Sequence, residues 1–400
     1  MGKPKKIPKP KKPYAGFPLW WHPSCYWTKK FSGKHVYFGS RNGTWQEALD
    51  HYNRDKEAHH LGQDPSDFRD GYSIADLCDD FLNDKQMSLD NGTLVESTYQ
   101  GYEFICDLLE SFFNAKRKVT SLTTGDFDRL RTHIGKLKNG KDASPTYIDN
   151  QVRGTKVVFN YAMKADKIDT QIKFGTQFKL EPRSKSRKYK AKKPSKLFGV
   201  NHLKQVLESA NDNPQMFAMI MISINCGFGP ADVGNLRLSH LDLVNRWHDS
   251  GRNKTGIYRR CRLWSETVKT LKAWLEFRDE KQAKRIANKS TVVDQFEENS
   301  DFVFLTRNGR SWYTGKSGET PVSVAFKKLK PPASLTFNCF RHSFRTIAGE
   351  SCDKEAVNLT MGHTPPKDIG ENTYVHSVSD KRLKKVSKIV RKHYKAAFAK

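Results

Sequence analysis

The chain has 400 residues, of which 36% are hydrophobic and 12% aromatic, with 70 Lys and Arg against 43 Asp and Glu. This length exceeds one ordinary domain core, and the hydrophobic content excludes a wholly disordered chain. The net charge of +27 favours a polyanionic partner over a purely solubilising role for the lysines. Charge alone does not separate DNA-binding proteins from ribosomal, heparin-binding or membrane-surface proteins.

The cysteines predict neither a zinc site nor a disulfide framework, because their number is odd and none are spaced C-x-x-C. A reduced, cytoplasmic compartment is therefore expected, with no cofactor and no metal. The first residues, MGKPKKIPKPKK, contain no apolar run typical of a signal peptide, and the apolar segment 217–224 is too short to span a membrane. The seven cysteines are Cys25, Cys78, Cys106, Cys226, Cys261, Cys339 and Cys352.

Residues 1–12 are rich in Lys and Pro and predict a disordered basic arm. The aromatic-rich runs 18–27 and 29–39 predict short strands, with a hairpin turning at Ser32-Gly33. Thr44 is expected to cap the following helix, with Glu47 completing a capping box. Residues 13–66 therefore predict a small basic β-sheet domain with one helix, which serves either as a structural appendage or as a second DNA contact.

Apolar residues then recur with helical spacing, and further helices are expected to start at Thr124 and Pro145. Residues 71–180 accordingly predict a bundle of four or five helices. Residues 183–196 carry eight basic residues in fourteen, which predicts a solvated linker that can also lie along phosphates.

Residues 198–400 predict a mainly helical domain with a small antiparallel sheet, so the fold class is multidomain α+β. The strands are expected within 240–247 and 256–264. Helices are expected at 200–210, 214–226, 231–236, 266–288, 323–329 and 341–351, and from residue 380 onward.

Four phrases in this last domain carry the chemistry. CFRHSFRT presents Arg341, MGH ends at His363, NTYVH places Tyr374 eleven residues further on, and NKTG places Lys254 in the predicted hairpin. In this order, with NCGFGPADVGNLRLSHLDL upstream, they resemble the catalytic half of the tyrosine site-specific recombinase, or phage integrase, family. The resemblance extends in outline to the whole chain: a β-sheet arm-type DNA-binding domain, a helical core-binding domain, a linker and a catalytic domain of the DNA breaking-rejoining type.

The resemblance implies a recombinase that acts on double-stranded DNA as a homotetramer, through a covalent 3′-phosphotyrosine on Tyr374 and without a cofactor. Arg341 would clamp the phosphate, because guanidinium bonds two phosphate oxygens at once. His363 would donate to a non-bridging oxygen or help deprotonate the nucleophile. Lys254 would protonate the leaving 5′-oxygen. Asn338 stands where the family usually has His or Lys, and it can still donate to a phosphate oxygen.

Each of these residues also has a plain structural explanation. Arg341 could cap or salt-bridge a helix, and His363 could be a satisfied turn histidine. Lys254 could be solvated, with Arg252 and Arg259 as nearby alternatives in sequence. Tyr394 competes with Tyr374, although its spacing from His363 fits the family less well.

The main departure is Gly229, which stands where the family has its first clamp arginine, while Asp232 keeps the acidic partner. Loss of one preorganised donor costs on the order of 10²–10³ in rate. Arg237, Arg259 or Arg260 could reach the phosphate instead, the enzyme could be slow, or the chain could be a degenerate DNA-binding relative that does not cut. Retention of the other site residues favours the enzyme. A basic ribosomal-type protein would not explain them.

Overall fold

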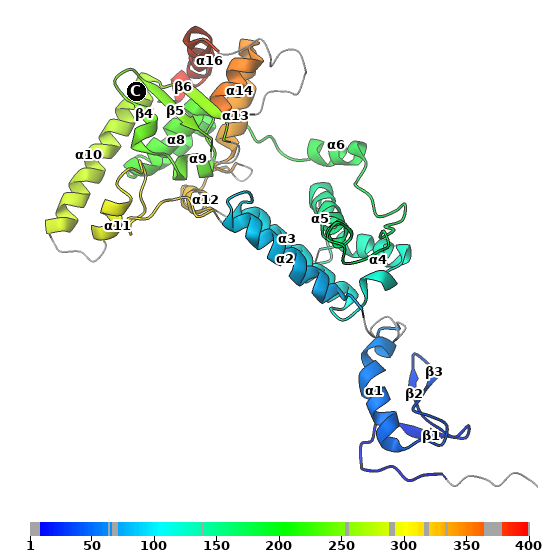
Figure 1. The fold of residues 1–400 in the computed structure, drawn as a ribbon. Helices are drawn as coiled ribbons and strands as arrows, with labels where there is room; N and C mark the ends of the chain where they lie inside the picture. The colour runs from blue at the N-terminus through cyan, green and yellow to red at the C-terminus, as the bar shows by residue number, and fades with distance from the viewer. Residues whose placement is uncertain are drawn as a thin grey trace, which may run out of the picture. The chain divides into compact units, whose positions relative to one another are not determined.

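The computed structural model describes residues 9–62, 65, 71–137, 139–252, 256–287, 293–315, 320–332, 335–363 and 378–398. The chain divides into two compact units, Met1–Lys190 and Ala191–Lys400. Both contain helices together with a small three-stranded antiparallel sheet, which confirms the predicted multidomain α+β class (Figure 1). None of the described helices is both long and apolar enough to cross a membrane.

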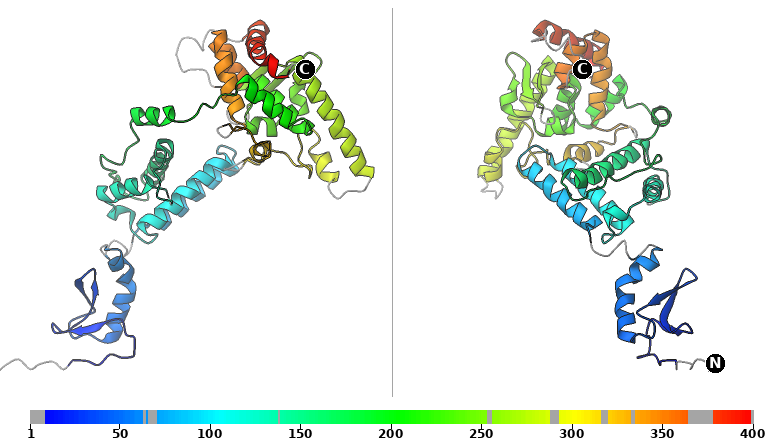
Figure 2. Two further views of the ribbon diagram at one scale, coloured as in Figure 1. Left: turned by 180° about the vertical axis from the view of Figure 1, so that it is seen from behind. Right: turned by 45° about the vertical axis from the view of Figure 1, so that its right-hand side comes forward.

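The N-terminal sheet is built from β1 (Trp20–His22), β2 (Tyr26–Phe31) and β3 (Lys34–Phe38), and helix α1 (Trp45–His60) packs against it (Figure 2). The predicted hairpin at Ser32-Gly33 is confirmed as the β2–β3 turn. The single strand predicted over 18–27 is wrong, because the chain turns at Cys25 (φ 68°) and pairs β1 with β2. The core consists of Phe17, Leu19, Trp27, Phe31, Phe38, Ala48 and Tyr52.

The predicted N-cap of α1 is present, but the predicted capping box is not. The Thr44 hydroxyl accepts from the Glu47 backbone N–H at 3.3 Å, as expected for an N-cap. The Glu47 carboxylate does not complete a capping box. It accepts instead from the backbone N–H and the hydroxyl of Ser40, both at 3.0 Å, and so ties the helix to the end of β3.

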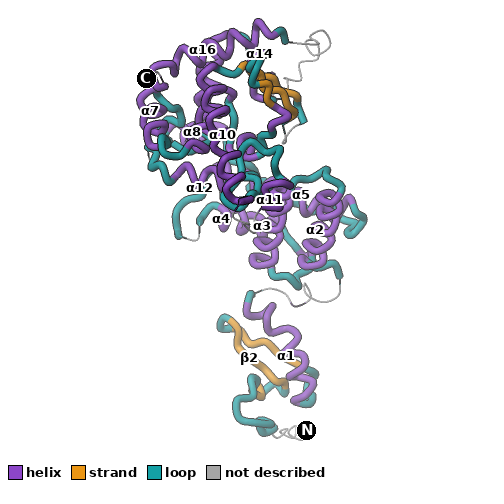
Figure 3. The backbone as a smooth tube through the Cα atoms, turned by 90° about the vertical axis from the view of Figure 1, so that its left-hand side faces the viewer, coloured by secondary structure: helices purple, strands orange, loops and turns teal. Residues whose placement is uncertain are grey.

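The helical part of the first unit comprises α2 (Ile74–Asp90), α3 (Glu96–Phe113), the short 3₁₀ turn η2 (Val119–Ser121), α4 (Thr124–Ile134) and α5 (Pro145–Lys164). Helices α2 and α3 pack on each other and on α5 (Figure 3). Apolar side chains from all four α-helices share one core. The helix starts predicted at Thr124 and Pro145 are confirmed.

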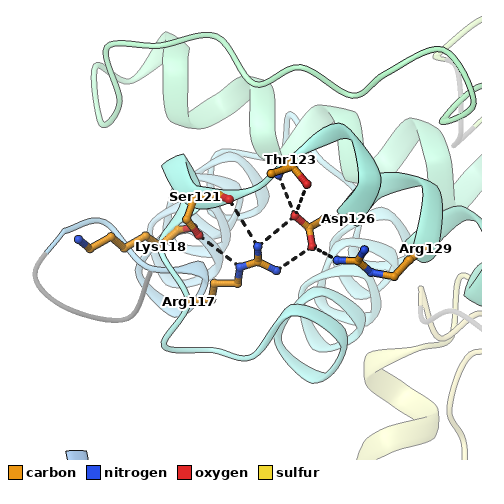
Figure 4. A network of polar contacts seen from close by, with 6 residues as sticks. All are labelled: Arg117, Lys118, Ser121, Thr123, Asp126 and Arg129. Carbon is orange, nitrogen blue, oxygen red and sulfur yellow. Dashed lines mark hydrogen bonds and ion pairs between the residues drawn. The ribbon is translucent and has the colours of Figure 1, made fainter. Parts of the chain in front are cut away.

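A buried ion pair fastens η2 to α4 (Figure 4). The Arg117 side chain is 6% exposed and donates through Nη1 and Nη2 to the two Asp126 oxygens at 2.9 and 3.0 Å. Asp126 also accepts from the N–H and hydroxyl of Thr123, both at 2.8 Å, and from Arg129. The same carboxylate therefore caps α4 and neutralises a buried arginine, which joins local helix chemistry to tertiary packing.

The basic run predicted as a linker forms helix α6 (Arg183–Ala191), none of whose side chains is buried. Lys and Arg have good helix propensity, and no Gly or Pro interrupts these residues. The expected solvation of the run is seen, whereas the helix was not predicted.

The second unit is organised around α8 (Pro214–Cys226), whose residues from Ala218 to Cys226 are all buried. It packs against α10 (Ser265–Ala287), α13 (Cys339–Ala348) and α16 (Asp380–Phe398), and α16 also packs against α7 (Val200–Ser209). A helix that is apolar all round requires such a central place. The sheet is β4 (Leu241–Asp242), β5 (Trp247–Gly251) and β6 (Tyr258–Arg262).

The remaining elements of this unit are short. Two helices were not predicted, α11 (Val293–Glu298) and α14 (Lys354–Met361). The others are α9 (Pro230–Gly234), η3 (Leu238–His240), α12 (Pro321–Lys327) and η4 (Gly349–Ser351).

Candidate functional site

Arg341 and His363, which are 22 positions apart in the sequence, are in direct contact. Arg341 lies in the first turn of α13, and His363 follows the end of α14. Arg341 Nη2 donates to His363 Nε2 at 2.8 Å and to the Met361 carbonyl at 2.8 Å, and Nη1 donates to the Gly227 carbonyl at 2.8 Å. Both carbonyls lie at helix C-termini, where unsatisfied oxygens and the helix dipole favour a cation. The fold thus brings these two predicted site residues together.

This contact fixes the protonation of His363. A guanidinium carries donors only, so Nε2 must accept, and the neutral ring then carries its proton on Nδ1. Burial, followed by the charges of Arg341 and Arg252, lowers the pKa of His363 to about 4. Burial also lowers the pKa of Arg341 to about 10, which leaves it protonated at neutral pH. In this arrangement Nδ1 is the only donor of the ring, and Nε2 can accept another proton only when the hydrogen bond from Arg341 opens.

A single carboxylate gathers three arginines beside this pair. Asp232 lies 3.0 Å from Arg259, 3.9 Å from Arg252 and 3.5 Å from Arg341. These four residues are called the Asp232 cluster. The Asp232 carboxylate also accepts from the Gly229 N–H at 2.8 Å, at the start of α9. The sequence identified Asp232 as an acidic partner but gave no sign of this assembly, because its members come from α9, α13 and the ends of two strands.

Two glycines with left-handed backbone permit this close approach. Gly227 ends α8 with φ 67°, and an added Cβ would lie 2.7 Å from the Phe344 ring. Gly362 ends α14 with φ 60°, and an added Cβ would lie 2.9 Å from Arg252 Cβ. A side chain at either position would be strained and crowded. Both glycines therefore shape the site.

Gly229 faces the cluster, as does Asn338. A Cβ placed on Gly229 would lie 3.1 Å from Asn338 Oδ1, 3.6 Å from Asp232 Oδ2 and 4.0 Å from Arg341 Cδ. Asn338 is exposed at the N-terminus of α13, and its side chain makes no capping hydrogen bond to that helix. The position at which the sequence analysis placed the absent clamp arginine therefore adjoins the Asp232 cluster.

Two of the three arginines considered as substitutes are held elsewhere. Arg237 pairs with Asp301 at 3.1 Å and covers the Phe302 ring. Arg260 pairs with Asp249 and Asp380 at 2.6 and 2.8 Å. Arg259 belongs to the Asp232 cluster, where it is 4% exposed and lies over the Phe228 ring at 4.3 Å.

Tyr394 is excluded as a competing nucleophile. It is fully buried, its hydroxyl donates to the Phe198 carbonyl at 2.7 Å, and burial raises its pKa to about 12. Tyr374 and Lys254 lie outside the described residues, so their roles stay predictions. Among the described residues, no group of three or more His, Cys, Asp or Glu side chains is placed to hold a metal ion.

Comparison with known proteins places this fold. A lambda integrase tetramer bound to a Holliday junction matches 89% of this chain and 95% of its own, with 14% identity and a TM-score of 0.52. The Tn1549 transposon integrase, residues 82–397, in complex with circular intermediate DNA matches 78% and 97%, with 17% identity and a TM-score of 0.50. At these identities the likeness concerns the fold. No curated protein sequence matches the chain at a significant level.

The sequence itself supplies the family. Residues 198–381 match the model of the phage integrase family. This segment contains the Asp232 cluster, Asn338 and His363, as well as the positions of Lys254 and Tyr374. Residues 198–381 therefore form a domain of the phage integrase family.

Proposed function

We propose that the chain is a site-specific DNA recombinase that breaks and rejoins double-stranded DNA through a covalent 3′-phosphotyrosine on Tyr374. The observation that carries this proposal is the contact of His363 with Arg341, a member of the Asp232 cluster. Three guanidinium groups surround one carboxylate beside a neutral histidine, so the site keeps a net positive charge. Such a site suits a phosphate whose negative charge grows in the transition state.

The proposed reaction conserves the phosphodiester bonds. The Tyr374 hydroxyl attacks the phosphorus and loses its proton to His363 Nε2, whose hydrogen bond from Arg341 opens when Arg341 turns to the phosphate. The bond from phosphorus to the 5′-oxygen breaks, and Lys254 protonates that oxygen. A free 5′-hydroxyl of another strand then attacks the phosphotyrosine and releases Tyr374, so the step needs no external energy source. Arg341 binds a non-bridging oxygen throughout.

The rest of the chain supplies DNA contacts in this proposal. The β-sheet domain over 13–66 and the helical domain over 71–180 bind the duplex, and the exposed basic face of α6 lies along phosphates. The lambda integrase in the matched structure is a tetramer bound to a Holliday junction. We propose the same stoichiometry on DNA here, because exchange of two strand pairs uses four nucleophiles.

A covalent adduct tests the proposal directly. A duplex is first selected for binding to the full chain from a random-sequence library, and it is then nicked beside each phosphate in turn, so that the short cleaved fragment diffuses away. The expected result is a protein–DNA adduct that survives a denaturing gel and is absent with Tyr374→Phe. Tyr394→Phe is the matched control and should still form the adduct.

Gly229 supports a second candidate, a DNA-binding relative that does not cut. In that case the selected duplex binds with a strong salt dependence, but no nick position gives an adduct. Failure to bind any duplex at moderate salt would contradict both candidates.

A further inference from the structure

The Asp232 cluster holds its arginines by different means, and this difference identifies the one that can act on a ligand. The Arg259 side chain is buried, lies over Phe228 and makes the shortest contact with Asp232, at 3.0 Å. Arg252 is 17% exposed and lies 3.9 Å from the same oxygen. Arg259 therefore neutralises the carboxylate, while Arg252 is held more loosely at the accessible edge.

Arg252 is also aimed at the two residues that define the site. Its aliphatic stem packs on Gly362, the residue before His363, and its Nη1 lies 3.5 Å from the Gly362 carbonyl. Its positive charge contributes, after burial, to lowering the pKa of both Arg341 and His363. The guanidinium thus lies beside Gly362 and Asp232, which adjoin His363 and Arg341 respectively.

The donors of Arg252 are incompletely used. Its Nε is buried and faces Asp232 at 3.9 Å, too far for a hydrogen bond, and it has no other hydrogen-bond partner among the described residues. A buried N–H left without an acceptor costs about 1–3 kcal/mol, so it favours the arrival of an anionic oxygen. A phosphate oxygen supplies a charge-assisted acceptor for a guanidinium fork.

We propose that Arg252 binds a non-bridging oxygen of the scissile phosphate together with Arg341, and so supplies the cation that Gly229 lacks. Arg259 acts as a positioning residue, because it holds Asp232 and thereby the two other arginines. This inference rests on the proposed recombinase function. It adds a catalytic residue that comes from the end of β5 instead of the start of α9.

The first experiment measures the rate of adduct formation on the selected nicked duplex with the full chain. Arg252→Gln keeps the stem on Gly362 and removes the charge, and it should slow the adduct by about 10²–10³-fold. Arg252→Lys should lose less, because it keeps the charge but not the fork. Arg310→Gln, at an exposed arginine whose Nε contacts Gln295 at 3.2 Å, is the matched control and should react as the unaltered chain does.

A second substrate separates a clamp from a leaving-group acid. In a duplex with sulfur in place of the bridging 5′-oxygen, the leaving thiolate needs no proton. This substrate should restore the reaction of Lys254→Ala but not that of Arg252→Gln. Full restoration of Arg252→Gln would overturn the clamp assignment and make Arg252 the proton donor instead.

A reciprocal substitution completes the test. Gly229 has an ordinary backbone φ of −93°, and an added Cβ meets only the Asn338 side chain closely. Gly229→Arg should therefore recover at least tenfold of the rate lost by Arg252→Gln. Arg252→Gln reacting within a few-fold of the unaltered chain would refute the inference alone, whereas absence of any adduct from the unaltered chain would refute the proposed function.

Discussion

Two carboxylates in this protein each organise arginines, and they do so in opposite ways. Asp126, in the first unit, receives a two-pronged hydrogen bond from Arg117, whose Nε and Nη2 also donate to Ser121. Asp232, in the second unit, faces three arginines at 3.0–3.9 Å, and Nε of both Arg252 and Arg259 has no hydrogen-bond partner among the described residues. Each nitrogen of Arg117 therefore has an acceptor, whereas Arg252 and Arg259 keep N–H groups that have no acceptor among the described residues.

The difference shows how a structural ion pair can be told from a binding site of the same residue types. A buried guanidinium is stable when each of its nitrogen atoms has a hydrogen-bond acceptor, as in Arg117. Excess cations around one anion are costly unless a further anion arrives. The Asp232 cluster has this excess, and this is why we assign it to phosphate binding and assign the Asp126 network to stability alone.

The largest expected effect falls on the complete pair. Asp126→Asn leaves the guanidinium of Arg117 buried without a counter-charge, and it should lower the free energy of unfolding by about 3–5 kcal/mol. Urea denaturation of the full chain, followed by circular dichroism, measures this change. Asp142→Asn removes the partner of an exposed Lys136, and it should change the free energy of unfolding far less because solvent screens this pair. Equal losses of unfolding free energy in the two variants would contradict the structural role given to the Arg117–Asp126 pair.

Asp232→Asn should reverse the pattern and affect activity more than folding. Its three arginines then repel one another without a counter-charge, so Arg341 and Arg252 move from their places. Adduct formation should fall about 10²-fold, while DNA binding at moderate salt persists. A loss of stability as large as that of Asp126→Asn, with activity retained per folded molecule, would show that the Asp232 cluster is a structural pair too.

A glycine substitution tests the carbonyl side of the Asp232 cluster. Gly227→Ala adds a Cβ 2.7 Å from Phe344 in a left-handed conformation, and it should destabilise the chain by about 2 kcal/mol. Gly349→Ala is the control, because it has φ −59° and no atom within 4 Å of an added Cβ. That variant should melt at or slightly above the temperature of the unaltered chain. Similar melting temperatures for both variants would contradict the packing described for Gly227.

Acid should lower the free energy of unfolding through His363 and through Asp126 in different pH ranges. His363 has a folded pKa of about 4 against 6.5 when unfolded, so the unfolded chain binds more protons between these values, and stability falls as the pH drops through them. Although burial raises the pKa of Asp126, hydrogen bonds from Arg117 and Thr123 bring it below 3.8, so its contribution is lost only at more acid pH. Unfolding free energies of the unaltered chain and His363→Gln, compared across both windows, measure the first effect. A difference between the two that does not change from pH 6.5 to about 4 would refute it.

Local signals in the sequence predicted most helices, and they also show why some were missed. Ser144 and Pro145 mark the start of α5 by capping chemistry alone. Asp353 caps α14 in the same way, because its carboxylate accepts from the Ala356 N–H at 3.0 Å, but this helix has only eight residues and so little apolar periodicity. Glu47 had the spacing for a capping box, yet a tertiary contact with Ser40 competed successfully for its carboxylate.

The site residues also divide into those that a local sequence motif predicts and those that only a tertiary contact reveals. Arg341, His363 and Asp232 follow from ordered motifs, because each lies within a short recognisable phrase. The role of Arg252 does not, because it depends on where the end of β5 meets the end of α14. Such a contact joins residues 110 positions apart and leaves no trace in local spacing.

Gly229 has a consequence for how proteins of this kind are recognised. A search that requires arginine at this position would reject the chain, although the folded molecule gathers three guanidinium groups around Asp232. A positive charge beside Asp232 can come from an arginine on another strand or helix instead of from position 229. Counting cations around the acidic residue at the start of α9 is therefore a better criterion for such a site than reading one letter of the motif.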